Sequence, residues 1–507
     1  MLLTALLQKL SEETEVHMGV SFAGHKYELD AEILQGIECV DISLDSRDAK
    51  EKGIFLAMEG DQTDGRNYIN EVFRKSVAVI FYESKSLTSD QQKTIDQSNC
   101  VCIAIHHLNQ YAGQIASLFF DQPSEQIQVY GITGTNGKTS CAYMLAQSFN
   151  FLGYQTAFMG TIGVGLPDKL TVSTHTTLNA VALQRYLAKL VRQGFTHVCI
   201  EVSSHALDQS RVAGVNFYAV LYTNLSQDHL DYHKTMQTYA EAKKKLFTDF
   251  NPTLAVINGD DPFGLALLEE TNAEFIVSYG KQGGVTDTVF EDISASRSGV
   301  SFVLEARSLE LDIESQLIGL LNVPNLALVA TTLLALGVDR EKIEQAIHDC
   351  QAPPGRMELF SQKDLPMVVV DYAHTPDAIQ AALESCRVHC QGELWIVFGC
   401  GGDRDQSKRA LMGSAAEQYA DKVVVCSDNP RSENPDDIIA AIIAPMTIEP
   451  IVIEHRATAV AYAVEQAAVN DLILLAGKGH EAGQIIGDET VAYSDRDWAK
   501  HCLGIAA

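Results

Sequence analysis

Short apolar runs rich in β-branched residues alternate with helical stretches along most of the chain, and most runs end in glycine or polar residues. Four of them are QIQVYGITG at 126–134, FTHVCIEVSS at 195–204, PMVVVDYAH at 366–374 and ELWIVFGCGG at 393–402. Apolar strands separated by helices predict parallel sheets that helices cover on both faces, which is the α/β class. Ligands of such sheets bind beyond the carboxyl ends of the strands, so the polar residues there mark a candidate site.

The length of the chain and its breakers predict three domains. The chain has 507 residues, against about 150 for a typical domain. The segment Ala352-Pro353-Pro354-Gly355 ends a helical stretch before the last series of strands and helices. We therefore expect a small α/β N-terminal domain over 1–106, a central domain with a mostly parallel sheet over 107–352, and a Rossmann-like C-terminal domain over 353–507.

The net charge argues against one large class of partners. The chain has 37 Lys and Arg residues against 66 Asp and Glu residues, a formal net charge of −29. A protein this acidic repels phosphate backbones and anionic lipid surfaces, so we expect no nucleic-acid partner and no docking on a membrane. No apolar run approaches the ~20 residues that a membrane span needs, so membrane insertion is not expected either.

The eleven cysteines are scattered and include no CxxC pair. Several lie in apolar runs such as HVCIEV and KVVVCSD. This pattern indicates buried free thiols in a reducing compartment rather than a disulfide framework or a zinc site. We therefore expect a cytoplasmic protein, and nothing in the sequence demands more than a monomer.

The segment GITGTNGKTS at 131–140 follows a strand and opens a helix, which is the context of a phosphate-binding loop. Glycines let backbone N–H groups approach phosphate oxygens, and the helix N-terminus favours negative charge. Lys138 is expected to reach the β- and γ-phosphates and Thr139 to hold Mg²⁺. The usual GxxxxGK[ST] pattern fails at Ile132, and an ordinary glycine turn is the alternative. The predicted nucleotide-binding residues of the loop are Gly134, Thr135, Asn136, Gly137, Lys138, Thr139 and Ser140.

Two further polar residues at strand ends are candidate magnesium ligands. Glu201 ends FTHVCIEVSSH, and His229 lies in TNLSQDHLDYH beside Asp228 and Asp231. With Thr139 they would supply oxygen and nitrogen ligands near the phosphates. A structural histidine is the alternative for His229.

Eight motifs, in order, resemble those of the ATP-dependent Mur ligases of peptidoglycan synthesis. They are GTNGKTS, EVSSHALDQSRV, TNLSQDHLDYH, PPGRME, DYAHTPD, GCGGDRD, DNPR and GKGHE. The resemblance runs over essentially the whole chain, from LDSR at 44–47 to GKGHE at 477–481. It implies an N-terminal UDP-binding domain, a central P-loop ATPase domain and a C-terminal domain for the incoming amino acid. It also implies that ATP, as co-substrate, phosphorylates a D-glutamyl side-chain carboxylate and that an amine then displaces the phosphate.

The same resemblance implies roles around the nucleotide. The implied catalytic residues are Lys138, Glu201, His229 and Lys243, and the implied Mg²⁺ ligands are Thr139, Glu201, His229 and Lys243. Lys243, in YAEAKKKLF, aligns with a lysine that CO₂ carbamylates, although sequence alone favours a solvated lysine in this KKK run. Residues implied to face ATP from elsewhere in the chain are Asn322, Asn325, Arg356 and Asp371.

For the UDP-N-acetylmuramoyl dipeptide, the resemblance implies two sets of contacts. The set at the uridine end is Leu44, Ser46, Asp61, Gln62 and Thr63. The set at the muramoyl dipeptide is His175, Thr176, Thr177, Ser203, Gln209 and Arg211. His175 stands where the family usually has Asn, and imidazole does not copy the donor and acceptor pair of an amide, so the role of residue 175 is open.

The resemblance places the amino-acid acceptor on the third block. The implied contacts are Arg404, Asp428, Asn429, Pro430, Arg431, Gly477 and Glu481. DNPR is the form seen in ligases that add meso-diaminopimelate, and Arg431 can pair with the distal carboxylate that lysine lacks. A helix-entry turn at Asn434-Pro435 explains the prolines of this segment but not Arg431. A lysine-adding ligase, another amide ligase such as folylpolyglutamate synthase, and a P-loop switch are the alternatives.

Overall fold

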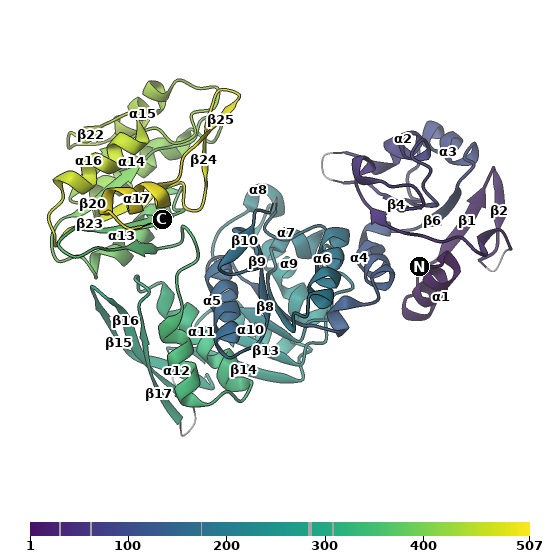
Figure 1. The fold of residues 1–507 in the computed structure, drawn as a ribbon, viewed down its shortest axis with the longest axis horizontal. Coiled ribbons are helices and arrows are strands. Elements are labelled where there is room, and N and C mark those ends of the chain that lie inside the picture. The colour runs from purple at the N-terminus through teal and green to yellow at the C-terminus, as the bar shows by residue number, and fades with distance from the viewer. Residues whose placement is uncertain (30–31, 61–62, 174, 282–285, 307–308, 507) are drawn as a thin grey trace. The chain divides into compact units, whose positions relative to one another are not determined.

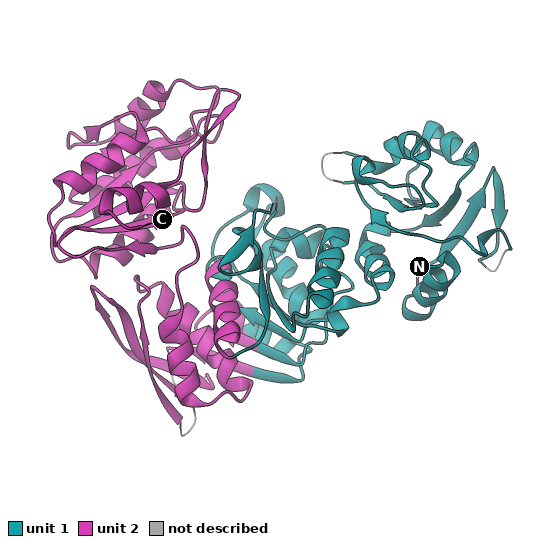
Figure 2. Ribbon diagram, viewed as in Figure 1, with its two compact units in different colours: residues 1–138, 153–255, 266–276 teal, residues 139–152, 256–265, 277–507 magenta. Residues whose placement is uncertain are grey.

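The computed structural model describes residues 1–29, 32–60, 63–173, 175–281, 286–306 and 309–506. The chain divides into two compact units, which are coloured separately in Figure 2. The first unit holds residues 1–138, 153–255 and 266–276, and the second holds residues 139–152, 256–265 and 277–507.

A six-stranded sheet in the order β2-β1-β6-β5-β4-β3 forms the N-terminal part of the chain (Figure 1). Its strands are β1 Met18–Phe22, β2 His25–Tyr27, β3 Ile42–Ser43, β4 Ile54–Ala57, β5 Val79–Glu83 and β6 Val101–Ile105. Strands β3 to β6 pair in parallel, whereas β1 pairs antiparallel with β2 and β6. The loops that follow β3 and β4 therefore leave the same edge of the sheet.

Helices cover both faces of this sheet. They are α1 Leu3–Glu13, α2 Ile69–Phe73, α3 Ser89–Asp96 and α4 Leu108–Phe119. The buried leucines of α1, Leu3, Leu6, Leu7 and Leu10, recur at helical spacing and share one hydrophobic cluster with α4, while α2 and α3 belong to a second cluster. Each such leucine contributes about 1.5–3 kcal/mol through burial. The first cluster also contains Ala180, which lies on a helix of the central part of the chain.

The central part of the chain forms an eleven-stranded sheet in the order β10-β9-β8-β11-β7-β12-β13-β14-β15-β16-β17. Its first six strands in the chain are β7 Gln128–Thr133, β8 Thr156–Gly160, β9 Gly163–Leu166, β10 Lys169–Thr171, β11 His197–Glu201 and β12 Ala219–Tyr222. The others are β13 Leu254–Asn258, β14 Phe275–Gly280, β15 Thr288–Ser296, β16 Gly299–Ala306 and β17 Leu309–Ser315. Its helices are α5 Lys138–Phe151, α6 Ala180–Arg192, α7 Ser204–Asp208, α8 Leu230–His233, α9 Met236–Thr248, α10 Pro262–Glu270, α11 Asn322–Ala335 and α12 Arg340–Asp349.

The pairing in this sheet is parallel near the phosphate loop and antiparallel at both ends of the strand order. β7 pairs in parallel with β11 and β12, and β8 pairs in parallel with β11. β8 to β10 and β15 to β17 form antiparallel ladders. The strands over 288–315 were not predicted from the sequence, because half-exposed strands such as TVFEDISAS carry polar and acidic residues instead of a continuous apolar run.

The C-terminal part forms a six-stranded sheet in the order β18-β19-β23-β20-β21-β22, and only β18 is antiparallel to its neighbour. The strands are β18 Glu358–Phe360, β19 Met367–Asp371, β20 Leu394–Phe398, β21 Lys422–Val425, β22 Ile451–Val452 and β23 Leu472–Ala476, followed by a separate pair, β24 Gly483–Ile486 and β25 Glu489–Ala492. The helices are α13 Pro376–Arg387, α14 Ser407–Tyr419, α15 Pro435–Ile443, α16 Arg456–Gln466 and α17 Asp495–Leu503. Every residue of β20 and β23 is buried, because α13 to α15 cover one face and α16 and α17 the other.

The α/β fold class with three sheet-bearing parts is confirmed. The three large sheets are built from residues 18–105, 128–315 and 358–476. The domain boundaries at 106/107 and 352/353 stay predictions. Among the described residues, no helix combines the length and the apolar character needed to cross a membrane. The eleven cysteines are free thiols, and most are buried.

Candidate active site

The phosphate loop connects the end of β7 directly to the start of α5. Gly134 and Gly137 have φ angles of 149° and 86°, which residues other than glycine rarely adopt. A Cβ atom on Gly134 would lie 1.8 Å from Oγ1 of Thr223. Ile132 lies within β7, so the departure from the usual pattern falls in the strand and not in the turn. The loop therefore has the glycine-dependent geometry expected of a phosphate cradle.

Hydrogen bonds fix the loop from two sides. Lys138 Nζ donates to the carbonyl oxygens of Gly134 and Thr135, each at 2.8 Å. Thr135 Oγ1 accepts from the backbone N–H of Ser226 at 3.0 Å and lies 3.1 Å from the hydroxyl of Tyr239. The ammonium of Lys138 is thus held at the N-terminus of α5, where anions are favoured.

Lys243 is a buried residue of α9 that lies against the same loop. Lys243 is only 1% exposed. Its Nζ donates to the Gly134 carbonyl at 2.7 Å and lies 4.4 Å from the ring centre of Tyr239. Burial, helped by the charge of Lys138, lowers the pKa of Lys243 well below its usual value. The solvated lysine favoured by sequence alone is therefore wrong for Lys243.

The other two lysines of the KKK run behave as solvated lysines. Lys244 pairs with Glu270, and Lys245 approaches Asp208 at 3.4 Å. All four side chains of these pairs are at least partly exposed. The register of α9 thus directs one lysine of three into the protein.

His229 interacts electrostatically with Lys138 of the phosphate loop and with Lys243 of α9. It has a left-handed backbone with φ of 53° directly before α8, a conformation that is strained for most side chains. Burial lowers the pKa of His229, with the charges of Lys138 and Lys243 adding to this effect and Asp228 opposing it. The ring lies 6.0 Å from that of Tyr239. The neutral imidazole that results is the form that binds metals.

Glu201 is buried at the end of β11. Its carboxylate accepts from the backbone N–H of Thr161 at 2.8 Å and from the Thr161 hydroxyl at 3.2 Å. Thr161 Oγ1 also lies 3.1 Å from Oγ1 of Thr176, so one threonine links two predicted site residues. A Cβ atom on Gly160 would lie 2.0 Å from the Glu201 carboxylate, which explains the glycine there. Thr161 was not predicted as a site residue, because no motif gives a signal for it.

Four residues predicted to contact the dipeptide form one network. Thr177 Oγ1 donates to the Glu201 carbonyl at 2.7 Å and accepts from the backbone N–H of Ser203 at 3.1 Å. Arg211 donates from NH1 to the Thr177 carbonyl at 3.3 Å and from Nε to Oε1 of Gln209 at 2.7 Å. The structure therefore brings Thr177, Ser203, Gln209 and Arg211 together beside Glu201.

His175 is exposed, and its backbone is fixed by Ser173. The Ser173 hydroxyl donates to the His175 carbonyl at 2.9 Å and accepts from its N–H at 3.4 Å. These contacts are to the backbone, so the role of the imidazole stays open.

The predicted uridine-end residues follow β3 and β4. Ser46 is buried at the start of a short 3₁₀ helix, and its carbonyl accepts from Lys75 Nζ at 2.7 Å. The Thr63 carbonyl accepts from the N–H of Gly60 at 3.0 Å in the loop after β4. Because β3 and β4 are parallel neighbours, Leu44, Ser46 and Thr63 lie at one edge of the N-terminal sheet. Asp61 and Gln62 lie outside the described residues.

Of the two asparagines predicted to face ATP, Asn325 contacts Cys141 of α5, and Asn322 contacts Asn325. Asn325 Nδ2 donates to Oδ1 of Asn322 at 3.3 Å, and Cys141 Sγ lies 3.4 Å from Asn325 Oδ1. Cys141 follows Thr139 and Ser140 in the same helix. The structure therefore brings the asparagines next to the helix that begins in the phosphate loop.

Arg356 and Asp371 are neighbours in the C-terminal part of the chain. The Arg356 guanidinium lies 4.7 Å from the ring centre of Tyr372, and its Nε is buried without a hydrogen-bond partner among the described residues. Asp371 accepts from the N–H groups of Met357 and Ala373 at 2.8 and 2.9 Å. Burial raises the pKa of Asp371, although Arg356 and both N–H donors oppose the shift.

The DNPR segment follows β21 and is shaped by glycines of the GCGG segment. Arg431 has a left-handed backbone with φ of 52°, and its NH1 donates to the Gly402 carbonyl at 2.7 Å. A Cβ atom on Gly401 would lie 2.9 Å from this NH1, and one on Gly402 would lie 1.9 Å from the Pro430 carbonyl oxygen. The helix-entry turn is also present, since Asn434 caps α15 three residues later.

Arg404 lies in the same pair of loops. Arg404 is exposed. The carboxylate of the preceding residue, Asp403, accepts from the hydroxyl and the N–H of Ser432 at 2.6 and 3.2 Å. The loop that carries Arg404 is therefore tied to the residue that follows Arg431.

Lys478 joins the remaining acceptor residues and was missed by the sequence analysis. It is 0% exposed, and its Nζ donates to Asp428 Oδ1 at 3.3 Å, Asn429 Oδ1 at 3.1 Å and Glu481 Oε2 at 3.2 Å. A Cβ atom on Gly477, where φ is 113°, would lie 2.9 Å from the Asp428 carboxylate. The residue stands in the GKGHE motif, but no spacing rule reveals its burial.

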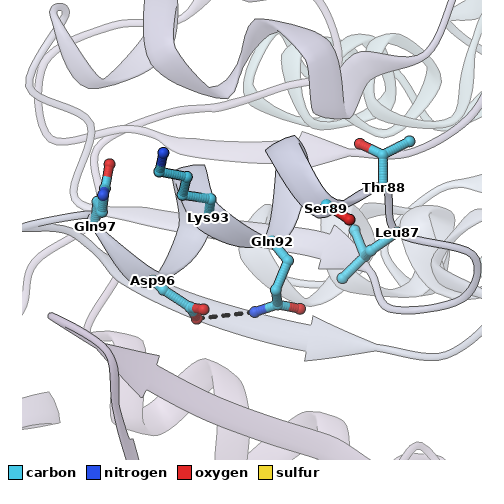
Figure 3. A pocket seen from close by; sticks show the side chains of 7 residues that line it. All are labelled: Leu87, Thr88, Ser89, Gln92, Lys93, Asp96 and Gln97. Carbon is cyan, nitrogen blue, oxygen red and sulfur yellow. Dashed lines mark hydrogen bonds between the residues drawn. The ribbon is translucent and has the colours of Figure 1, made fainter.

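Two cavities lie away from all of these residues. The larger one, about 510 Å³, lies at helix α3 in the N-terminal part of the chain, where Gln92 donates to Asp96 at 2.8 Å (Figure 3). The other, about 400 Å³, lies at the amino ends of β7, β11 and β12, opposite the phosphate loop. Neither is lined by a predicted site residue, so we place the candidate site at the strand ends and not in a cavity.

Comparison with known families and proteins gives matches over most of the chain. The Mur ligase middle domain matches residues 132–333, and the Mur ligase, glutamate ligase domain matches residues 355–479. A UDP-N-acetylmuramoyl-L-alanyl-D-glutamate--2,6-diaminopimelate ligase of Haemophilus influenzae (strain PittGG) is 41% identical over 473 residues, which are 92% of this chain and 97% of that protein.

Solved structures of similar fold include Mur ligases and a related ligase. A UDP-N-acetylmuramoyl-L-alanyl-D-glutamate--2,6-diaminopimelate ligase superposes with a TM-score of 0.71 and 32% identity, covering 95% of this chain and 97% of the other. Folylpolyglutamate synthase of Mycobacterium tuberculosis, complexed with ADP and AMPPCP, has a TM-score of 0.58, 19% identity and coverage of 73% and 92%, a likeness of fold alone. By its identity to a relative of nearly equal length and by its two matched domains, the chain belongs to the Mur ligase family.

Proposed function

We propose that this chain is an ATP-dependent ligase that adds meso-2,6-diaminopimelate to UDP-N-acetylmuramoyl-L-alanyl-D-glutamate in cytoplasmic peptidoglycan precursor synthesis, and that it works as a monomer. The observation that carries the proposal is the 41% identity over 92% of the chain to a ligase with this substrate pair in its name. The arrangement around Arg431 supports it, because a guanidinium held at a strand end suits an acceptor with a second carboxylate.

The proposed reaction has two chemical steps. The D-glutamyl side-chain carboxylate attacks the γ-phosphorus of ATP, so that a carboxylate–phosphorus bond forms and the bond to ADP breaks. The amine of diaminopimelate then attacks the acyl carbon, phosphate leaves, and the amine loses a proton as the amide forms. Negative charge develops on the transferred phosphoryl group, and Lys138 and the N–H groups of the phosphate loop would stabilise it.

The donor set beside the phosphate loop fits Mg²⁺. Among the described residues, no group of three or more His, Cys, Asp and Glu side chains could hold a metal by itself. Mg²⁺ commonly takes one or two carboxylates and completes its shell with water and substrate phosphates, so a sparse protein set suits it. Thr139, Glu201 and His229 would hold it. The bound ion would neutralise phosphate charge as the phosphoryl group transfers.

We further propose that Lys243 is carbamylated. In that reaction the neutral amine attacks CO₂, a carbon–nitrogen bond forms, and one proton is released to leave a carbamate anion. Lowering of the Lys243 pKa by burial and by Lys138 favours the neutral amine that this step requires. The carbamate would give the site an anionic oxygen ligand, at the position where the unmodified lysine contacts a backbone carbonyl and a ring.

The acceptor would be recognised by opposite charges at its two ends. Arg431 and Arg404 would bind the distal carboxylate of diaminopimelate, and Asp428 and Glu481 would bind an ammonium. Lysine lacks the distal carboxylate, so binding it would leave Arg431 desolvated without a partner. Such an unmade charged hydrogen bond costs about 1.5–3 kcal/mol, which favours diaminopimelate by roughly ten- to a hundredfold.

Measuring phosphate release from ATP, with each substrate omitted in turn, tests the reaction class. We expect release only when the UDP-linked dipeptide and diaminopimelate are both present. Release that needs neither would show a P-loop switch and contradict the ligase proposal. An acceptor panel of meso-diaminopimelate, lysine and ornithine at equal concentration tests the substrate, and preferential use of lysine would contradict the proposed specificity.

A further inference from the structure

Lys478 lies in the loop after β23 and has its entire side chain inside the protein. Its neighbours are three residues assigned above to the acceptor: Asp428, Asn429 and Glu481. We propose that Lys478 is a positioning residue that fixes the two carboxylates of the acceptor site at the spacing needed to receive an ammonium. This inference rests on the proposed function, because it concerns the acceptor of that reaction.

The hydrogen bonds of Lys478 join two separate loops. Asp428 and Asn429 follow β21, whereas Glu481 follows β23, and the Lys478 ammonium lies within 3.3 Å of an oxygen of each. Asn429 completes the link, since its Nδ2 donates to Glu481 Oε2 at 3.0 Å and its Oδ1 accepts from the N–H of Ile485 at 2.9 Å. One ammonium therefore sets both the separation of the loops and the orientation of the asparagine amide.

Lys478 cannot itself be a contact of the substrate in this arrangement. An ammonium has three N–H donors, and three oxygens of the protein already take them. The side chain is also 0% exposed, whereas that of Glu481 is 34% exposed and that of Asp428 is 10% exposed. The carboxylates face the solvent side and the lysine lies behind them, so Lys478 acts on a ligand only through its partners.

The charges of the cluster explain why such a residue is useful. Asp428 and Glu481 carry two negative charges and Lys478 one positive charge, so the cluster keeps one net negative charge for an incoming ammonium. Without Lys478 the two carboxylates would repel each other in a poorly solvated place, and the partly exposed Glu481 would turn toward water. The loss would affect the acceptor and not the nucleotide, which is assigned to other residues.

The test compares KM values for diaminopimelate and ATP in the full-length enzyme. Lys478→Met should raise KM for diaminopimelate roughly tenfold or more, while KM for ATP stays near the wild-type value. Lys478→Arg keeps the charge but moves the donors, so it should fold and still raise the ratio of the two KM values, by less. An unchanged ratio in either folded variant would overturn the inference, and so would an equal rise of both constants.

Two further measurements separate positioning from general destabilisation. Arg456→Met removes an equally buried cation of the same part of the chain. Its partners Asp495 and the Ala476 carbonyl are not assigned to the acceptor, so the variant should lower Tm without changing the KM ratio. In a Glu481→Gln background, Lys478→Met should have a smaller effect than in wild type, because the two residues act as a unit. Additive effects would contradict the mechanism. If wild-type enzyme forms no amide with diaminopimelate, the proposed function fails instead.

Discussion

Lys243 and Lys478 are both buried lysines at predicted substrate sites, but their partners differ. Lys243 donates to a backbone carbonyl, lies over a tyrosine ring and, among the described residues, forms no ion pair. Lys478 donates to two carboxylates and an amide. The first lysine has a pKa that burial lowers well below its usual value, so its buried amine tends to be neutral.

The type of partner thus indicates what a buried cation is for. A lysine whose ammonium is balanced by carboxylates is an internal support, since its charge and its donors are already used. A cationic side chain that donates only to carbonyl oxygens keeps its charge or its reactivity for a ligand. By this criterion Arg431, which donates to the Gly402 carbonyl, belongs with Lys243, and Arg456, paired with Asp495, belongs with Lys478.

The largest expected effect tests Lys243. Lys243→Met should lower kcat by about 10²–10³-fold, because the site loses the anion that the carbamate would supply to the metal and the transferred phosphoryl group. Steady-state kinetics measure this loss. Wild-type enzyme should also lose activity in CO₂-depleted buffer and regain it with bicarbonate. Since CO₂ reacts with the neutral amine, this recovery should slow as the pH is lowered toward the Lys243 pKa.

Lys244→Met is the matched control for Lys243. Lys244 is the next residue of α9, but its side chain is partly exposed and pairs with the exposed Glu270, and surface ion pairs contribute little. Its kcat and both KM values should equal those of wild type. If Lys244→Met lost as much activity as Lys243→Met, or if Lys243→Met retained full activity, the contrast between the buried and the solvated lysines would have no functional meaning.

A smaller effect is expected for Arg431, which donates to the Gly402 carbonyl. Arg431→Ala should raise KM for diaminopimelate roughly ten- to a hundredfold and leave KM for ATP nearly unchanged, because a charged hydrogen bond to the distal carboxylate is lost. Lysine, which has no such carboxylate, should gain relative to diaminopimelate in the same variant. Unaltered KM for diaminopimelate would place Arg431 among the internal supports and break the criterion.

The parts of the site that are local in sequence could be predicted, and those that depend on long-range packing could not. The phosphate loop and the polar strand ends are contiguous segments whose chemistry can be read directly, and the buried parallel strands of the three sheets follow from continuous apolar runs. The burial of Lys243 depends on how α9 packs against β7, and a run of three lysines gives no sign of it. The bond from Thr161 to Glu201 joins the turn after β8 to the end of β11, 40 residues away, and leaves no pattern in either segment.

Lys478 shows the same limit within a recognised motif. GKGHE was predicted to bind the acceptor through its glycine and its glutamate, and its lysine would ordinarily be assigned to solvent because lysines are rarely fully buried. Only the three-dimensional meeting of the loops after β21 and β23 reveals its partners. The antiparallel strands over 288–315 were missed for a related reason, since half-exposed strands lack the apolar runs that identify buried ones.

The last and smallest effect concerns a buried base outside the site, His197 at the start of β11. Its ring stacks on Tyr130 and lies near Tyr154, and burial lowers the pKa of His197 from 6.5 to about 4. Below about pH 6.5 the unfolded chain therefore binds a proton that the folded chain does not, so the free energy of unfolding falls as the pH drops toward 4 and is unaffected by this group above 6.5. At about pH 5 the loss is at most about 2 kcal/mol, at roughly 1.4 kcal/mol per pH unit.

Urea unfolding at about pH 7 and about pH 5 measures this loss of unfolding free energy. His197→Phe, which keeps a ring in the stack, should reduce the dependence on pH by this amount. An equal dependence in the variant would mean that burial of this base has no energetic cost, and the explanation of the lowered Lys243 pKa by the same cause would then lose its support.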